Sequence, residues 1–195
     1  AAQVDALCAG GIDFIKDDEL QVNGPHCPFE ERVAAVMQVI ERHADRLGRK
    51  PMFAFNLTGE PDEMRRRHDI ALEAGATCVM ASLNSVGLSG MLHLSRHSEL
   101  PIHAHRCGWG YLSRHPALGF DYAAWSAFWR LAGADHMHVN GLRNKFCEPD
   151  ASVIASARAL LTPMFDPPGP GNVVVPVFSS GQTPDQAWDT YAQLG

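Results

Sequence analysis

A lysine followed at once by three acidic residues is the feature of this 195-residue chain with the clearest chemical potential. Lys16, Asp17, Asp18 and Glu19 come directly after an apolar run. Side chains alternate along a strand, so Lys16 and Asp18 share one face, and Glu19 can turn inward where the strand becomes a loop. Carboxylate oxygens are ligands that suit Mg²⁺. A lysine amine that has added CO2 becomes an anionic carbamate, which is a further oxygen ligand.

The same residues also allow a plainer interpretation. Lys16 could remain an ammonium group that neutralises the carboxylates beside it. A protonated lysine would repel a metal ion, so the two hypotheses exclude each other. Spacing alone leaves both open.

The overall composition limits the possible partners. The formal net charge is −6, and the longest basic run, Arg65 to Arg67, follows Asp62 and Glu63 in a helical pattern typical of a solvated face. We therefore expect no nucleic-acid partner. No apolar run approaches the ~20 residues that a membrane span needs, and no signal peptide is visible. We expect no membrane partner and a cytoplasmic location.

The five cysteines are scattered and form no paired-ligand pattern with the histidines. Reduced thiols are the expected state, and a zinc site is not expected.

Short apolar runs alternate with longer amphipathic runs along the chain. Strands are expected at residues 12–16, 52–56, 77–82, 101–105, 134–138 and 173–178. Helices are expected at residues 1–9, 29–47, 61–74, within 86–95, from the cap at Asp121 to 131, at 149–161, and after the Thr183-x-x-Gln186 capping box. This alternation predicts a parallel sheet covered by helices.

Polar residues follow the apolar part of every expected strand, as on the active-site face of a (β/α)8 barrel. No glycine-rich nucleotide-binding motif supports a doubly wound sheet instead. The predicted fold is therefore α/β, an incomplete (β/α)8 TIM barrel with about six βα units. A closed barrel needs eight strands, so we expect residues 1–195 to be an internal fragment of a catalytic domain, without the first and last barrel strands and without any N-terminal domain.

The segment from Gly10 to Glu19 closely resembles the metal-site motif of the RuBisCO large-chain superfamily. The resemblance implies that Lys16 is carbamylated and binds Mg²⁺ together with Asp18 and Glu19, with Asp17 outside the metal shell. It also implies the C-terminal catalytic domain of that family and two cofactors, Mg²⁺ and the CO2 held as a lysine carbamate.

Four later segments extend the resemblance over most of the chain. His105 and Arg106 resemble a strand-end pair in which the histidine lies near the metal and the arginine holds a substrate phosphate. His138, in Asp-His-x-His, resembles a phosphate-binding histidine, whereas His136 is expected to be structural. The resemblance further implies that Lys145, on a mobile loop, stabilises a developing carboxylate. Ser179 and Gly181 match a serine-glycine turn that contacts the substrate and binds a phosphate.

Several positions depart from the carboxylases of the family. Leu20 follows the acids in place of asparagine, Ser180 replaces a glycine, and residues 107–110 replace a histidine-containing segment. Arg143 and Asn144 make the loop after His138 more polar. These changes resemble the RuBisCO-like proteins, the non-carboxylating branch, and most closely the subgroup that acts on 3-oxo-isoapionate 4-phosphate.

The resemblance implies a lyase or isomerase that forms an enediolate, with Mg²⁺, from a phosphorylated ketose or 3-keto sugar acid. Decarboxylation, carboxyl transfer or isomerisation would follow. A genuine ribulose-1,5-bisphosphate carboxylase/oxygenase large chain and an idle homologue with a binding role are the alternatives. The expected partners are a phosphorylated sugar or sugar acid and further copies of the full-length chain, as a homodimer or higher homo-oligomer.

Overall fold

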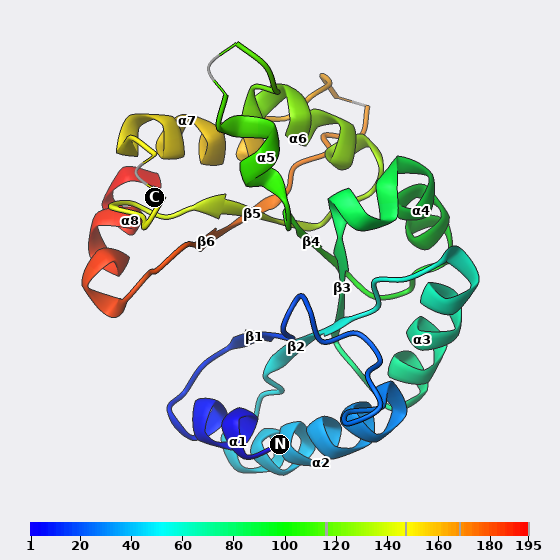
Figure 1. The fold of residues 1–195 in the computed structure, drawn as a ribbon. Helices are drawn as coiled ribbons and strands as arrows, with labels where there is room; N and C mark the ends of the chain where they lie inside the picture. The colour runs from blue at the N-terminus through cyan, green and yellow to red at the C-terminus, as the bar shows by residue number, and fades with distance from the viewer. Residues whose placement is uncertain (116, 147, 168, 195) are drawn as a thin grey trace. The chain divides into compact units, whose positions relative to one another are not determined.

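Strands and helices alternate throughout the computed structural model of the protein (Figure 1). It describes residues 1–115, 117–146, 148–167 and 169–194. The chain divides into two compact units, Ala1–Cys107 and Gly108–Gly195.

The first unit contains four parallel strands in sequence order, each pairing with the next. Its helices form an outer layer in which α2 packs on α3 and α3 on α4 (Figure 1). The elements are α1 (Ala2–Ala9), β1 (Phe14–Lys16), α2 (Phe29–Leu47), β2 (Met52–Asn56), α3 (Pro61–Glu73), β3 (Cys78–Ser82), α4 (Leu83–His97) and β4 (Ile102–His105).

Burial on both faces explains why these strands are apolar runs. All five residues of β3 are buried, as are Phe53 and Phe55 of β2. Helix α2 buries Val33, Val36, Met37 and Ile40, which recur at helical spacing and form one apolar stripe. It ends at Gly48, whose φ of 69° is a left-handed conformation that glycine adopts without steric cost. The predicted parallel α/β arrangement is confirmed in this unit.

The second unit contains two parallel strands with four α-helices among its described residues. The elements are α5 (Trp109–Ser113), α6 (Tyr122–Leu131), β5 (His136–Asn140), α7 (Asp150–Leu161), β6 (Val175–Ser179), the 3-10 turn Pro184–Gln186 and α8 (Ala187–Leu194). Asp121 caps α6 by accepting from the Ala124 amide at 3.1 Å, as predicted. The Thr183 capping box is also present.

Arg130 holds the long connection between α7 and β6 in place. Its guanidinium donates to the carbonyls of Ala159, Thr162 and Asn172 at 2.5 to 2.8 Å. Arg130 belongs to α6 and is buried, and this burial lowers the pKa of its guanidinium. One side chain thus satisfies three carbonyls of the α7 end and the irregular segment after it.

Some predicted boundaries were wrong. The strands expected at 134–138 and 173–178 run two and one residues further, because Asn140 and Ser179 are still paired in the parallel ladder. The first strand begins at Phe14 and not at residue 12. Helix α4 is longer than expected and is kinked at Gly87, where φ is 68°. Helix α5 was not predicted.

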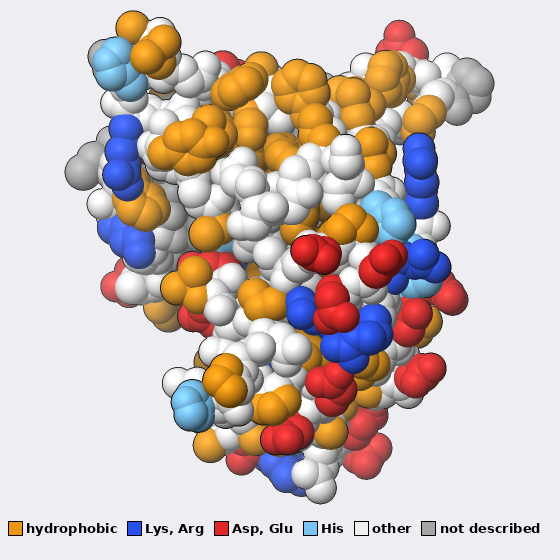
Figure 2. All heavy atoms as spheres, turned by 45° about the vertical axis from the view of Figure 1, so that its right-hand side comes forward, with side chains coloured by type: hydrophobic (Ala, Val, Ile, Leu, Met, Phe, Trp, Pro, Cys, Tyr) orange, Lys and Arg blue, Asp and Glu red, His pale blue; other side chains and the backbone are white. Residues whose placement is uncertain are grey.

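Acidic and basic side chains lie intermixed on the face drawn in Figure 2. In the first unit, Arg66 of the basic run Arg65 to Arg67 pairs with Glu30 and Glu63. Among the described residues, no helix is both long enough and apolar enough to cross a membrane.

Candidate active site

The end of β1 brings the Lys16 amine against an acidic side chain. Lys16 Nζ donates to Glu19 Oε2 at 3.0 Å and to the Asp17 carbonyl at 2.8 Å. Burial raises the pKa of Glu19, but hydrogen bonds from its own amide and from Lys16 outweigh this and hold the pKa below its ordinary value. Both hypotheses for Lys16 predict this contact. An ammonium group would pair with the Glu19 carboxylate, and a carbamate would lie beside it as a second oxygen ligand of the same metal ion.

His105, at the end of β4, faces the same carboxylate. Its Nε2 lies 3.8 Å from Glu19 Oε2, and its Nδ1 accepts from the Cys107 amide at 3.1 Å. Burial, followed by the positive charge of Lys16, lowers the pKa of His105 to about 4. The ring is therefore neutral near pH 7, and its proton lies on Nε2, on the Glu19 side.

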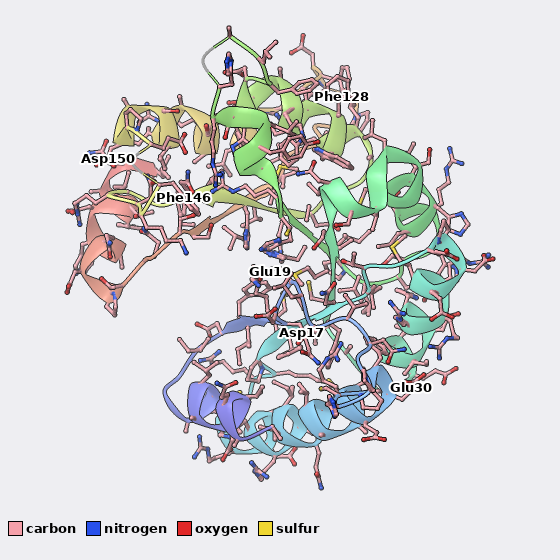
Figure 3. All side chains as sticks on the ribbon, viewed as in Figure 1. Asp17, Glu19, Glu30, Phe128, Phe146 and Asp150 are labelled. Carbon is pink, nitrogen blue, oxygen red and sulfur yellow. The ribbon has the colours of Figure 1, made fainter. Side chains whose placement is uncertain are left out.

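Asp17 is committed to a different partner. It is buried and accepts from Arg32 Nε at 2.8 Å and from the Asn56 amide at 3.3 Å. Burial raises its pKa, and the charge of Arg32 only partly offsets this. Figure 3 shows Asp17 on the side of the acidic segment that faces α2, and Glu19 farther from that helix. Asp17 therefore anchors the segment to α2.

Asn56, at the end of β2, holds the backbone of the acidic segment. Its side-chain amide donates to the carbonyls of Asp18 and Glu19 at 3.1 and 3.0 Å. Its Oδ1 accepts from the amide and hydroxyl of Thr58, so the fully buried side chain is held at both ends. Asp18 itself closes a turn, accepting from the Leu20 amide through Oδ1, which leaves its second carboxylate oxygen as a possible ligand.

Replacing Asn56 with alanine is expected to lower the free energy of unfolding by about 2–3 kcal/mol, because two carbonyls lose a buried donor. The same change should weaken binding at the Mg²⁺ site that the resemblance implies, since the backbone that aims Asp18 and Glu19 is released. Asn84→Ala, which loses one side-chain hydrogen bond to the Cys107 carbonyl, is the matched control. Urea unfolding and metal titration measure the two effects. Equal losses in both variants would contradict the role of Asn56.

In the second unit, His138 lies within β5 and not at its end. It is buried, and its carbonyl accepts from the Tyr122 hydroxyl at 2.5 Å. The strand was predicted to end at His138, but β5 continues to Asn140, so Asn140 and not His138 is its last residue. His136, on the same strand, has a pKa that burial lowers.

Lys145 lies beside the turn that contains Ser179 and Gly181. The Lys145 amide donates to the Ser180 carbonyl at 3.1 Å, and a Cβ added at Gly181 would lie 3.6 Å from Lys145 Cβ, in contact with the stem of that side chain. Ser179 Oγ donates to the Val139 carbonyl at 3.0 Å. The loop after β5 and the turn after β6 therefore form one packed structure that carries three predicted site residues.

A polar chain around Asn140 supports this structure and was not predicted as part of the site. Ser180 has a left-handed backbone, with φ at 71°, and its hydroxyl donates to Asn140 Oδ1 at 2.6 Å. Asn140 Nδ2 in turn donates to Glu148 at 2.5 Å. The sequence signal was Ser180 itself, a serine at a family glycine position, where a positive φ is strained and must be held by the surrounding structure.

The structure thus groups the predicted residues in two sets. Lys16, Glu19 and His105 meet directly, and Asp18 and Arg106 lie in the same unit, where the charge of Arg106 also lowers the pKa of His105. The other set belongs to the second unit and comprises His138, Lys145, Ser179 and Gly181.

Residues 1–195 match a known family described as "Ribulose bisphosphate carboxylase large chain, catalytic domain". The chain is 62% identical over 195 residues to a 3-oxo-isoapionate-4-phosphate transcarboxylase/hydrolase of Xanthobacter autotrophicus, covering 100% of this chain and 47% of the relative. It is 45% identical to a 3-oxo-isoapionate-4-phosphate decarboxylase of Rhizobium rhizogenes, covering 100% and 46%. The chain therefore spans about half the length of these curated relatives.

Solved structures agree with this similarity. A RuBisCO-like protein from Burkholderia fungorum superimposes with a TM-score of 0.94 at 47% identity, covering 99% of this chain and 47% of that one. A dimeric archaeal RuBisCO from Hyperthermus butylicus gives a TM-score of 0.85 at 26% identity, covering 98% and 47%. The predicted fold class, an incomplete (β/α)8 barrel of the RuBisCO type, is confirmed.

Proposed function

This chain belongs to the ribulose bisphosphate carboxylase large-chain family, and from that premise we propose that the whole protein is a RuBisCO-like enzyme acting on 3-oxo-isoapionate 4-phosphate. The observation that carries the proposal is the 62% identity, over all 195 residues, to a transcarboxylase/hydrolase named for that substrate. The contact among Lys16, Glu19 and His105 supports it, because it places titratable groups at the carboxyl ends of β1 and β4.

The donor set in the first unit fits Mg²⁺. Asp18 and Glu19 offer carboxylate oxygens, and Lys16 would add the oxygens of a carbamate, formed when its amine takes up CO2 and releases a proton. An all-oxygen set is what this hard cation prefers. When bound, Mg²⁺ would supply Lewis-acid polarisation of a substrate carbonyl.

The remaining roles fall to the chain's own side chains. In both candidate reactions the bond to the carboxyl group breaks, and its electron pair stays beside the ketone as an enediolate; we assign the Lys16 carbamate as the acid–base group that exchanges protons with that enediolate. Neutral His105 presents an Nε2–H that can donate to a substrate oxygen. Lys145 offers an ammonium group for a carboxylate. The groups assigned to phosphate are Arg106, His138, Ser179 and Gly181.

Two reactions are candidates for the same substrate. Carboxyl transfer with hydrolysis is favoured by the relative at 62% identity, and decarboxylation is favoured by the relative at 45%. The whole protein should be incubated with Mg²⁺, bicarbonate and 3-oxo-isoapionate 4-phosphate labelled with ¹³C in its carboxyl group. We expect the label in non-volatile products, whereas a decarboxylase would release it as CO2.

A parallel assay tests the carboxylase alternative. Fixation of labelled CO2 into ribulose 1,5-bisphosphate by the same preparation would overturn the proposal. No turnover of either substrate, together with unchanged metal binding in Lys16→Ala, would favour the idle homologue.

We also propose that the whole protein is a homo-oligomer. Its structural relatives include a RuBisCO described as dimeric and one from Pyrococcus horikoshii described as octameric. Light scattering of the purified protein tests this, and a monomer would contradict it.

A further inference from the structure

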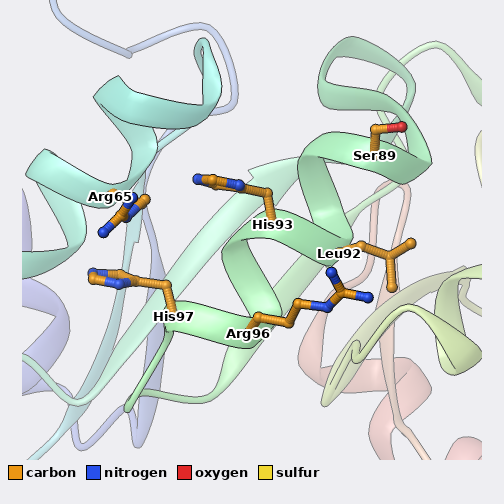
Figure 4. A pocket seen from close by; sticks show the side chains of 6 residues that line it. All are labelled: Arg65, Ser89, Leu92, His93, Arg96 and His97. Atoms are coloured by element: carbon orange, nitrogen blue, oxygen red, sulfur yellow. The ribbon is translucent and has the colours of Figure 1, made fainter.

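A basic groove lies between helices α3 and α4, within the first unit. Its volume is about 430 Å³, within the range of small-molecule sites, and none of its lining residues belongs to the predicted active site. The lining is formed by Arg65 of α3 and by one face of α4, namely Ser89, Leu92, His93, Arg96 and His97 (Figure 4). Four of these six side chains are arginines or histidines, and none is acidic.

The two arginines of the groove differ from their neighbours in having no partner. Arg66 and Arg67 both pair with Glu63. Arg65 and Arg96, by contrast, form no ion pair or hydrogen bond with any residue that the structure describes. Two guanidinium groups are therefore left with their full donor capacity for a ligand.

His93 provides the second observation. Its Nε2 is buried and has no hydrogen-bond partner within the described part of the chain. Figure 4 shows His93 and His97 directed from α4 toward Arg65, whereas Arg96 points the other way. A buried ring nitrogen without a partner is unfavourable, and an anion accepting from Nε2–H would satisfy it.

A metal site is the competing interpretation, because His68, Asp69 and His97 bring ligand atoms within 4.8 Å of one another. The hydrogen bonds argue against it. His68 Nε2 accepts from the Glu99 amide at 3.2 Å, so the proton of the neutral ring lies on Nδ1 and is directed to Asp69 at 3.0 Å. That nitrogen has no free lone pair for a metal. Asp69 also binds His97 Nε2 at 2.6 Å, which orients the His97 ring.

We propose that this groove is an anion site that binds a phosphate group, either as inorganic phosphate or as the phosphate monoester of a small metabolite. Arg65 supplies a planar pair of donors that matches phosphate oxygens, and His93 supplies a donor that has no other use. Arg96, which also lines the groove, is directed away from Arg65, where it can hold a second anionic group of a larger ester. The inference stands independently of the proposed catalytic function.

The test is a calorimetric titration of the whole protein with inorganic phosphate and, separately, with glycerol 1-phosphate. Arg65→Gln should weaken binding at the groove about tenfold, the loss expected for one charge-assisted hydrogen bond. Arg66→Gln is the matched control, because it removes the same charge from the next residue of α3 without touching the groove. His93→Gln should also weaken binding. Tighter binding of the ester than of phosphate would identify a metabolite as the ligand, and equal binding would identify the phosphate group alone.

The predicted active site also contains phosphate ligands, so the titrations are repeated in an Arg106→Gln background. Binding that survives this change and is lost on adding Arg65→Gln supports the groove. Equal affinities in Arg65→Gln and Arg66→Gln, or loss of all phosphate binding in Arg106→Gln alone, would overturn it. Neither result depends on which reaction the enzyme catalyses.

Discussion

Lys16→Ala is expected to lower turnover of 3-oxo-isoapionate 4-phosphate by about a thousandfold, because it removes both a metal ligand and the proposed base. In the wild-type protein, Mg²⁺ should bind more tightly as bicarbonate is added, because the proposed reaction of CO2 with the Lys16 amine would create an anionic ligand. In Lys16→Ala, bicarbonate should have no effect on Mg²⁺ affinity. Turnover assays and calorimetric Mg²⁺ titrations at several bicarbonate concentrations measure these outcomes.

This result separates the two hypotheses that the sequence leaves open. If Lys16 is only an ammonium paired with the partly exposed Glu19, its loss costs little stability and bicarbonate does not affect metal binding in either protein. Lys50→Ala is the matched control, because Lys50 pairs with Glu41 and with the Gly75 carbonyl at the surface of the first unit. Bicarbonate-independent Mg²⁺ binding in the wild type would remove the carbamate from the proposal.

The elements of the fold could be predicted because each depends on local sequence. The residues that form the apolar stripe of α2, the Asp121 cap of α6 and the Thr183 capping box lie close together in the sequence, so each pattern can be recognised locally. The ends of β5 and β6 were predicted less accurately. Their last residues are polar and so look like loop, whereas pairing with the neighbouring strand keeps Asn140 and Ser179 in the ladder.

The residues that position the site were harder to identify. Asn56 and Arg32 come from β2 and α2, far along the chain from the acidic segment that they hold. Asn56 could be expected only as the polar end of a strand, and Arg32 only as one polar residue of a helix, because what each one binds depends on which strand and helix lie beside β1. Ser180 was noticeable only as a departure from glycine, and its bond to Asn140 required the pairing of β5 with β6. Local patterns therefore identified the reactive groups but not the groups that orient them.

Arg32 is the positioning residue with the largest expected effect on stability. It is buried, and besides its ion pair with Asp17 it donates to three carbonyls of the loop before α2, those of Gln21, Val22 and Cys27. One guanidinium therefore fixes both ends of the connection that carries Glu19. Since burial already raises the pKa of Asp17, its carboxylate depends on this one cation for charge compensation.

Arg32→Met is expected to lower the free energy of unfolding by about 3–5 kcal/mol, because it leaves the Asp17 carboxylate buried without its cation. Arg42→Met is the control: Arg42 pairs with the half-exposed Asp5, and the loss of such a surface pair costs about 0–1 kcal/mol. Adding Asp17→Asn to Arg32→Met should recover part of the loss, since it removes the uncompensated charge while the loop carbonyls stay unpaired. Urea unfolding of the four proteins measures this. If Arg32→Met costs no more than Arg42→Met, the buried pair does not hold the acidic segment, and the orientation of Glu19 must come from its contacts with Asn56 and Lys16.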